Sequence, residues 1–320
     1  LRLIKFDSNN LQCTGSIISV DPASLNVERV WYQYSGYGHR ILMYKIKNNR
    51  SLFSAIFTSY ISAFGITAGA HRLWTHKTYK AKLPLEILLM LLNCLAFQGS
   101  VIYWVREHRM HHKYSDTDAD PHNSTRGFFF SHIGWLLVKR HPELLKRGNL
   151  IDVSDVNNNP VLKFQKKYQV LLFLSICFVL PTLTPVYYWG ESLNNALFIG
   201  VFRYIYGLHA TFLVNSAAHK WGNKPYDNKI RPVENKTVSF LSVGEGFHNY
   251  HHVFPRDYRT AELGNNNLNW TTKFIDFFAW IGWAYDLKTV SPELLDMRLK
   301  RTGEEKNTMV YKNLSDELIF

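Results

Sequence analysis

Long uncharged apolar stretches constrain this chain more than any other feature of its sequence. Residues 51–70 and 168–190 carry no charged side chain over 20 and 23 positions, and residues 192–218 are interrupted only by Arg203 and His209. About 20 apolar residues in a helix are enough to cross the hydrocarbon core of a bilayer. Tyrosine and tryptophan gather at the end of the second stretch, as is typical of a membrane interface. The sequence therefore predicts an all-α membrane protein with spans at about 51–70, 168–190 and 192–218.

Histidine is concentrated in four short motifs. The motifs read HRLWTH, EHRMHH, NSAAH and GEGFHNYHH, and they hold nine of the 14 histidines: His71, His76, His108, His111, His112, His219, His248, His251 and His252. Residues at i, i+3 and i+4 share a helix face, so HRMHH and HNYHH are each expected to bring three ring nitrogens together. His71 and His76 lie about 140° apart on an ideal α-helix, which indicates a helix end or two ligands for different metals.

Nine imidazoles at one site predict two metal ions, because one ion rarely takes more than six ligands. Imidazole suits iron, zinc, copper and nickel, so spacing alone leaves the metal open. A catalytic zinc usually needs three protein ligands, whereas two redox-active irons could bind and split dioxygen.

The position of the motifs restricts which stretches cross the membrane. If residues 51–70 and 87–105 both crossed once, His71 and His108 would lie on opposite sides of the bilayer. We therefore expect residues 87–105 to be an interfacial or re-entrant amphipathic segment. Between positions 71 and 167 there are fifteen Lys or Arg against eight Asp or Glu. The positive-inside rule then places the histidines on the cytosolic side.

The charge balance and the cysteines exclude some classes of protein. The formal net charge is +12, which fits an anionic membrane surface or an anionic ligand. Nucleic acid is not an expected partner, because the chain has no zinc-finger spacing, RNP motif or base-reading basic helix. The three cysteines lie far apart in sequence, which favours buried thiols over a disulfide framework.

Several motifs together resemble one enzyme family. GITAGAHRLW, EHRMHH, DADPHNSTRGFFFSHIGWLL, NSAAH and GEGFHNYHH, within residues 51–290, resemble the integral-membrane acyl-CoA desaturases, most closely those of insects. The resemblance implies an endoplasmic-reticulum membrane enzyme with four transmembrane helices and a cytosolic helical cap that holds a di-iron centre. It also implies that the nine histidines bind the two irons and that Asn215 acts through a water.

The resemblance implies a reaction and its partners. A saturated fatty acyl-CoA is dehydrogenated to an alkene with dioxygen as co-substrate, and both oxygen atoms leave as water. Electrons come from cytochrome b5 and its NADH-dependent reductase. No haem-binding domain is evident in this chain, so the donor is expected in trans. The position of the double bond stays open between Δ9, Δ10 and Δ11, and with it a housekeeping or a pheromone role.

The resemblance also implies substrate-binding residues. Arg106, Glu107, Lys139 and Arg140 match positions that contact the CoA head group. Tunnel positions near the metals and at its closed end are matched by Gln98, Trp104, Thr211, Phe212, Ser59 and Ala63. Phe212 stands where many family members have Trp, which predicts a wider tunnel there.

The two ends of the chain depart from the apolar pattern. Residues 1–50 contain Arg40, Lys45, Lys47 and Arg50 where the family has its first transmembrane helix, and each charge disfavours insertion. Residues 291–320 are expected to form a polar cytosolic tail. Two other functions stay open: a membrane di-iron hydroxylase or alkane monooxygenase, and a desaturase homologue whose catalysis is impaired by the altered N-terminus.

Overall fold

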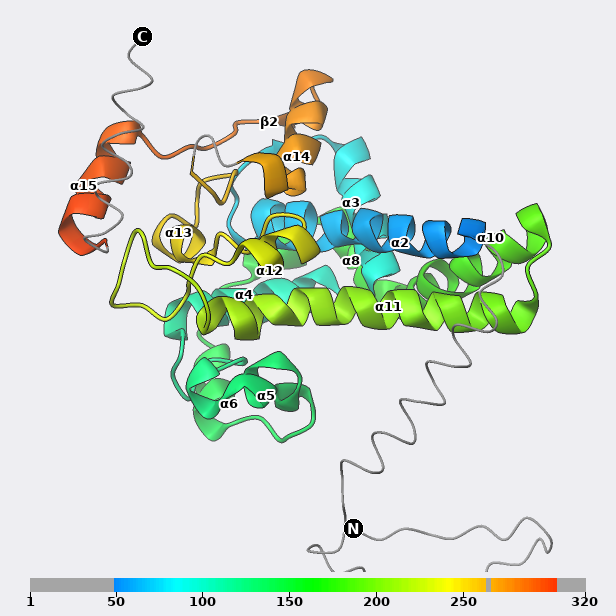
Figure 1. Ribbon diagram of the computed structural model, residues 1–320, viewed down its shortest axis with the longest axis horizontal. Coiled ribbons are helices and arrows are strands. Elements are labelled where there is room, and N and C mark those ends of the chain that lie inside the picture. The colour runs from blue at the N-terminus through cyan, green and yellow to red at the C-terminus, as the bar shows by residue number, and fades with distance from the viewer. Residues whose placement is uncertain (1–48, 263–265, 304–320) are drawn as a thin grey trace, which may run out of the picture. The chain divides into compact units, whose positions relative to one another are not determined.

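A computed structural model describes residues 49–262 and 266–303 (Figure 1). The chain divides into two compact units, residues 1–49 and 50–320. Apart from Asn49, all of the described residues belong to the second unit. The prediction about a degraded first span falls almost entirely on residues 1–48, which lie outside the described residues.

The described part is mostly helical, as the sequence predicts, and only one two-stranded ladder interrupts the helices there. The ladder pairs β1 (Lys80–Ala81) with β2 (Ala284–Tyr285) in antiparallel register. The α-helices are α2 (Asn49–Phe64), α3 (Leu83–Ala96), α4 (Val101–Tyr114), α5 (Phe128–His132), α6 (Pro142–Gly148), α7 (Ser154–Asn158), α8 (Pro160–Lys167), α9 (Gln169–Phe173), α10 (Leu180–Trp189), α11 (Leu193–Ser216), α12 (Lys236–Leu241), α13 (His248–Val253), α14 (Trp270–Trp280) and α15 (Pro292–Thr302). The π- and 3-10-helical segments are η2 (Gly65–Thr75), η3 (Ser124–Arg126), η4 (Gly134–Leu136), η5 (Leu174–Val179), η6 (Ala217–His219) and η7 (Asn266–Leu268).

Three continuous helices in the described part are long and apolar enough to cross a membrane. They are Asn49–Thr75, which joins α2 to η2, Gln169–Trp189, which joins α9, η5 and α10, and Leu193–His219, which joins α11 to η6. Large apolar side chains such as Phe53, Leu171 and Tyr187 are exposed on them. Exposed apolar surface of this extent is expected where a helix faces lipid instead of water.

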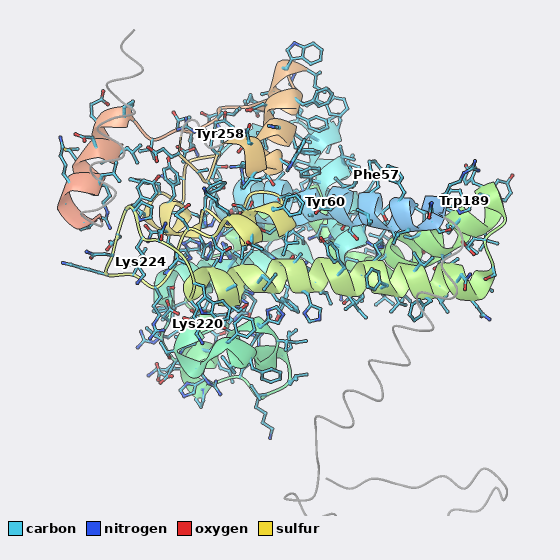
Figure 2. All side chains as sticks on the ribbon, in the orientation of Figure 1. Phe57, Tyr60, Trp189, Lys220, Lys224 and Tyr258 are labelled. Atoms are coloured by element: carbon cyan, nitrogen blue, oxygen red, sulfur yellow. The ribbon has the colours of Figure 1, made fainter. Side chains whose placement is uncertain are left out.

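The long helices are joined to one another by polar contacts. Ser59 Oγ on α2 donates to the Arg203 carbonyl on α11 at 3.3 Å, and the two helices run alongside each other in Figure 1. At the far end of α10, Trp189 Nε1 donates to Ser51 Oγ, which in turn donates to Glu191. Figure 2 shows Trp189 at this end, away from Lys220 and Lys224. These bonds fix the start of α2 against the turn between α10 and α11.

The segment 87–105 is not continuous. Helices α3 and α4 meet at an angle of 82°, a geometry of a broken span or of a re-entrant loop. The break lies at FQGS, where Phe97 has φ 49° and Gly99 has φ 86°, and Ser100 caps α4 by accepting from the Tyr103 N–H. A re-entrant segment was among the sequence predictions, but the sharp break was not. It turns α4 so that EHRMHH faces η2.

The main core lies between these segments. Helix α3 packs on η2, and α4 packs on η2 and α8. Leu85, Leu89, Val101, Leu162 and Ile275 are fully buried there. Close packing of η2 against α3 needs Gly65, because a Cβ there would lie 2.1 Å from the Asn93 nitrogen. This core holds the two helices that carry the first and second histidine motifs.

Candidate metal centre and substrate cavity

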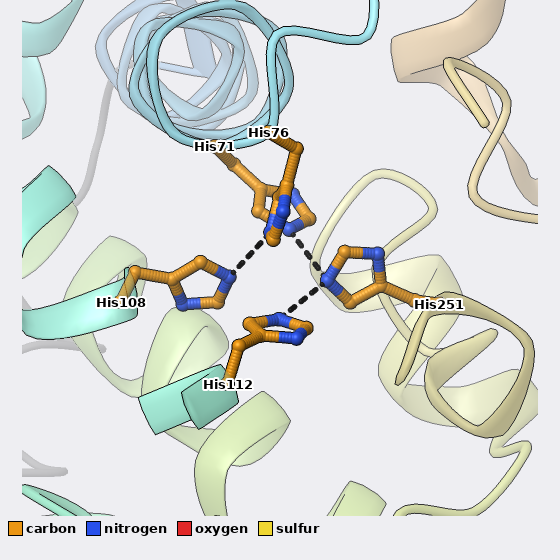
Figure 3. A group of neighbouring side chains, drawn as sticks. All are labelled: His71, His76, His108, His112 and His251. Carbon is orange, nitrogen blue, oxygen red and sulfur yellow. Dashed lines mark hydrogen bonds between the residues drawn. The ribbon is translucent and has the colours of Figure 1, made fainter. Parts of the chain in front are cut away.

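Five imidazoles form the first cluster, called here the five-histidine group (Figure 3). Its members are His71, His76, His108, His112 and His251, each with one ring nitrogen within 4.8 Å of the others. The Nε2 atom of His251 lies 2.9 Å from those of both His71 and His112, and the Nε2 atoms of His76 and His108 lie 3.1 Å apart. Nitrogens at this separation suit neighbouring ligand positions on one ion with bonds of about 2.1 Å.

The π-helix η2 explains why both histidines of HRLWTH enter this group. In a π-helix the hydrogen bond runs from i to i+5, and the His76 N–H donates to the His71 carbonyl at 3.1 Å. Residues five apart therefore lie on one face. Of the two options that the 140° spacing left open, the helix end is confirmed, because His76 is the C-cap residue of η2. The other option, ligands for two different metals, was wrong, because both histidines belong to one group.

Four imidazoles form the second cluster, the four-histidine group. Its members are His111, His219, His248 and His252. The Nε2 atom of His248 lies 3.0 Å from that of His219 and 3.1 Å from that of His252, and His252 lies 3.3 Å from His111. All nine histidines predicted from the motifs thus lie in two adjacent groups.

The two HxxHH motifs do not each serve one group. On α4, His108 and His112 are four residues apart and point into the five-histidine group, while His111 points into the four-histidine group. On α13, His248 and His252 belong to the four-histidine group and His251 to the other. The expectation of three converging nitrogens per motif was therefore wrong. Each motif bridges both groups, because i and i+4 share a face more closely than i and i+3.

Carboxylates hold several of these rings from outside. Glu245 Oε2 lies 2.8 Å from His71 Nδ1, and both Asp120 oxygens lie within 3.0 Å of His111 Nδ1. Asp116 lies 3.4 Å from His219 Nδ1. Each carboxylate favours the proton on Nδ1, which leaves the Nε2 lone pair pointing into its group.

Burial favours the neutral form of most of these imidazoles. Burial, followed by neighbouring histidines, lowers the pKa values of His248, His251 and His252 well below the ordinary value. Burial alone would raise the pKa of Glu245, but Arg72 and then His71 outweigh it and lower that pKa to about 2. Neutral rings beside ionised carboxylates are the protonation states that metal binding requires.

The spacing of the ring nitrogens indicates whether the residues fit a metal. Lone pairs on nitrogens about 3 Å apart repel one another unless a cation or a proton lies between them. The geometry of both groups, their all-imidazole donors and their outer carboxylates fit two bound cations.

Three neighbouring cavities, which have lining residues in common, lie beside the two groups. The outer cavity is lined by Arg126, Lys139 and Arg140, and it shares Tyr103, Trp135 and Leu136 with the next one. The middle cavity shares Gln98, Trp104, His108, Thr211 and Asn215 with the inner one. The inner cavity passes His71, His108 and His248 and continues between α2 and α11 to Ser59, Ala63 and Tyr206.

Most of the predicted substrate residues line this path. Ser59 and Ala63 line the inner cavity, Glu107 and Phe212 the middle one, and Lys139 and Arg140 the outer one. Gln98 Nε2 donates to Thr211 Oγ1 at 2.8 Å beside the five-histidine group. Arg140 pairs with the buried Glu107 and donates to the Tyr103 hydroxyl.

Arg106 is the exception among the predicted substrate residues. It lines none of the three cavities, and its guanidinium donates to Asn149 Oδ1 at 3.2 Å.

The residues that hold the histidines in place were not predicted from the sequence. Asp116 and Asp120 lie in the stretch SDTDAD, which begins three residues after the end of EHRMHH, and Glu245 precedes His248 of HNYHH by three residues. Carboxylates this close to the histidine motifs could have been predicted to contact the rings. Metal-bound histidines usually donate the N–H of their second ring nitrogen to a carboxylate or another acceptor. Arg72 was missed too: it is fully buried and donates to Glu245, Asn269 and Thr272.

Comparison with known proteins agrees with this site. The model of the fatty acid desaturase family matches residues 51–264. An acyl-CoA Delta(11) desaturase of Trichoplusia ni is 66% identical over 275 residues, 86% of this chain and 78% of the relative. One of Spodoptera littoralis is 62% identical over 277 residues, 87% and 82% of the two chains. An acyl-CoA Delta-9 desaturase of Acheta domesticus is 54% identical over 269 residues, 84% and 75% of the two.

This chain belongs to the fatty acid desaturase family. The resemblance inferred from the motifs is confirmed, and so is the class of membrane oxidoreductase that it implied.

Proposed function

We propose that this protein is an acyl-CoA desaturase that introduces a double bond at carbon 11 of a saturated fatty acyl-CoA. One observation supports the reaction class most directly. The five-histidine group and the four-histidine group both border the same apolar cavity. The Δ11 position is supported by three relatives at 60–66% identity that are named acyl-CoA Delta(11) desaturases.

We propose iron as the metal, held by the nine histidines, with Asn215 acting through a water. Two iron ions, when bound, would supply the reduction of dioxygen and the removal of hydrogen from an unactivated carbon. Burial lowers the pKa of most of these imidazoles and so favours their neutral form, and Glu245, Asp116 and Asp120 orient three of the rings.

The protein's main contribution is to position the substrate. Apolar lining on α2 and α11 keeps water from the alkyl chain, and the cavity runs past both histidine groups. The hydrogen-bonded residues Gln98 and Thr211 line the cavity together with His108, so they would restrict how the chain bends there. Holding two neighbouring methylenes at a fixed place is what makes the double bond form at one position.

Lys139 and Arg140 would hold the phosphates of CoA at the outer cavity. The electrons would come from cytochrome b5 and its NADH-dependent reductase at the endoplasmic-reticulum membrane, with the histidine side cytosolic. The high density of basic residues around the histidine motifs supports that orientation.

Expression in yeast that lacks its own desaturase tests this proposal. Growth without added unsaturated fatty acid, and a Δ11 alkene located by mass spectrometry of the derivatised methyl esters, are the expected results. A hydroxylated acid would instead identify a hydroxylase, and an alkene at carbon 9 would overturn the Δ11 position. An iron-loaded protein without product would identify the impaired homologue; replacing residues 1–50 with a relative's first helix would then restore activity.

A further inference from the structure

Two side chains at the middle cavity have buried ring nitrogens without a hydrogen-bond partner among the described residues. Among the described residues, no hydrogen bond is made by His122 Nδ1 or by Trp135 Nε1. Only 8% of His122 is exposed, and its ring packs perpendicular to that of Trp135 at 4.5 Å. Both residues line the middle cavity, and Trp135 also lines the outer one.

Within residues 49–262 and 266–303, no protein group satisfies these atoms. Asp120 is the nearest carboxylate, yet its oxygen lies 3.9 Å from His122 Nδ1. That carboxylate already accepts from His111 Nδ1 and from the backbone N–H groups of Asp116 and His122. A buried donor without a partner is costly, so such a group in a native cavity wall indicates a missing acceptor.

The chemistry of that acceptor follows from the donors. An indole N–H only donates, and a neutral imidazole offers one N–H. Phe212, whose ring is perpendicular to Trp135 at 6.3 Å, lies on the same cavity and has no donor. The unpartnered N–H groups of this cavity wall therefore suit an uncharged oxygen atom that accepts hydrogen bonds, such as a carbonyl oxygen.

The position of the middle cavity indicates which carbonyl groups of an acyl-CoA would lie beside His122 and Trp135. The wall lies between the basic outer cavity, suited to phosphates, and the histidine groups, where the alkyl chain would react. In an acyl-CoA this interval holds the pantetheine amides and the thioester.

We propose that Trp135 and His122 form a carbonyl-binding subsite that holds the pantetheine–thioester part of the substrate. This inference rests on the proposed function. The subsite fixes the carbonyl end of the substrate, and thereby helps to set the distance from that end to the carbon that reacts.

Equilibrium binding to the purified, metal-loaded protein in nanodiscs tests the subsite separately from turnover. Trp135→Phe keeps an aromatic ring and removes the N–H. Its matched control is Trp283→Phe, because Trp283 stacks on Phe278 and lines none of the three cavities. His122→Leu removes the imidazole, and His122→Asn restores a donor of smaller size.

Palmitoyl-CoA is the first probe. Trp135→Phe and His122→Leu are each expected to weaken its binding roughly three- to tenfold, the usual effect of one hydrogen bond. His122→Asn should recover part of the loss, and Trp283→Phe should bind like the wild type. KM should rise with binding while kcat changes less, because the metal ligands are untouched.

The thioether analogue, in which a methylene replaces the thioester carbonyl, locates the acceptor. A loss by Trp135→Phe with palmitoyl-CoA but not with the thioether assigns the thioester carbonyl. If Trp135→Phe weakens the binding of palmitoyl-CoA and of the thioether equally, the acceptor is a pantetheine amide. In that case the binding of S-ethyl thiopalmitate, which lacks the amides, should not be weakened. Wild-type binding by both variants, or a loss shared by all three probes, would overturn the subsite. Correct binding behaviour without alkene formation by the wild type would instead refute the proposed function.

Discussion

Glu245 Oε2 lies 2.8 Å from His71 Nδ1, and the other oxygen of this carboxylate accepts from Arg72 at 2.8 Å. The adjacent residues His71 and Arg72, on the π-helix η2, thus meet one buried carboxylate from the loop before α13. This contact ties HRLWTH to GEGFHNYHH across 173 positions of sequence.

Removing the charge of Glu245 should weaken metal binding. Glu245→Gln retains the shape but no longer favours the proton on His71 Nδ1, and such outer partners typically change metal affinity about 10- to 100-fold. The measurement is iron content against chelator concentration in purified protein. Glu143→Gln, whose carboxylate pairs with the exposed Arg147, should retain wild-type iron; equal iron retention in both variants would contradict the role of Glu245.

The two histidine groups should lose metal independently. His76 belongs to the five-histidine group and His252 to the four-histidine group. We expect His76→Ala and His252→Ala each to abolish desaturation and to lower bound iron from two towards one per chain. Elemental analysis together with iron spectroscopy would show whether the remaining ion differs between the two variants. Two irons per chain in either variant would argue against the assignment of that histidine.

The end of the inner cavity should set the length of the acyl chain. Ala63 lines that cavity on α2, and a phenylalanine there would fill space that the methyl end of the substrate needs. Ala63→Phe is expected to shift the products of a 14-, 16- and 18-carbon mixture towards the shortest chain, as gas chromatography of the methyl esters would record.

Ile56→Phe is the matched control for that change. Ile56 is 47% exposed on the same helix and does not line the cavity, so its product profile should equal that of the wild type. An unchanged profile for Ala63→Phe would show that the chain ends elsewhere.

Arg140 should contribute to binding of the CoA head group. Arg140→Gln removes a cation from the outer cavity and leaves the buried Glu107 without its partner. KM for palmitoyl-CoA should rise about three- to tenfold and become less sensitive to salt. Arg147→Gln removes an equal charge that lines none of the three cavities. If both variants raise KM alike, the effect is one of general charge and not of this site.

Glu234 should make the protein less stable at alkaline pH. Burial raises the pKa of Glu234 to about 8, with Glu262 adding to the effect. The folded state therefore keeps a proton that the unfolded state loses above a pH of about 4.5. The resulting stability is fully present below that pH, falls by at most about 1.4 kcal/mol per pH unit as pH rises, and is lost once pH passes 8.

The Glu234→Gln variant tests this sign. Its amide oxygen can still accept from the Tyr250 N–H, as Glu234 does at 2.8 Å. The difference in thermal midpoint between pH 6 and pH 9 should therefore be smaller in the variant. An equal difference in variant and wild type would show that another group titrates.

Much of this protein follows from its sequence. The uncharged lengths of residues 51–70, 168–190 and 192–218 predict apolar helices because backbone polar groups in a bilayer must be satisfied within the segment. The nine histidines are recognisable because their spacing has no other common purpose. Gln98, Trp104 and Thr211, which the resemblance placed along the tunnel, line the inner cavity, and their role in substrate binding stays a prediction.

Only the tertiary structure decided how the histidines divide between two groups. The direction of a side chain depends on the local helix type, and neither the π-helical winding of η2 nor the break at Phe97–Ser100 was predicted from the sequence. The outer carboxylates and the unpartnered nitrogens of His122 and Trp135 are likewise products of long-range contact. Sequence spacing reports on one element at a time, whereas a metal centre and a cavity wall are assembled from several.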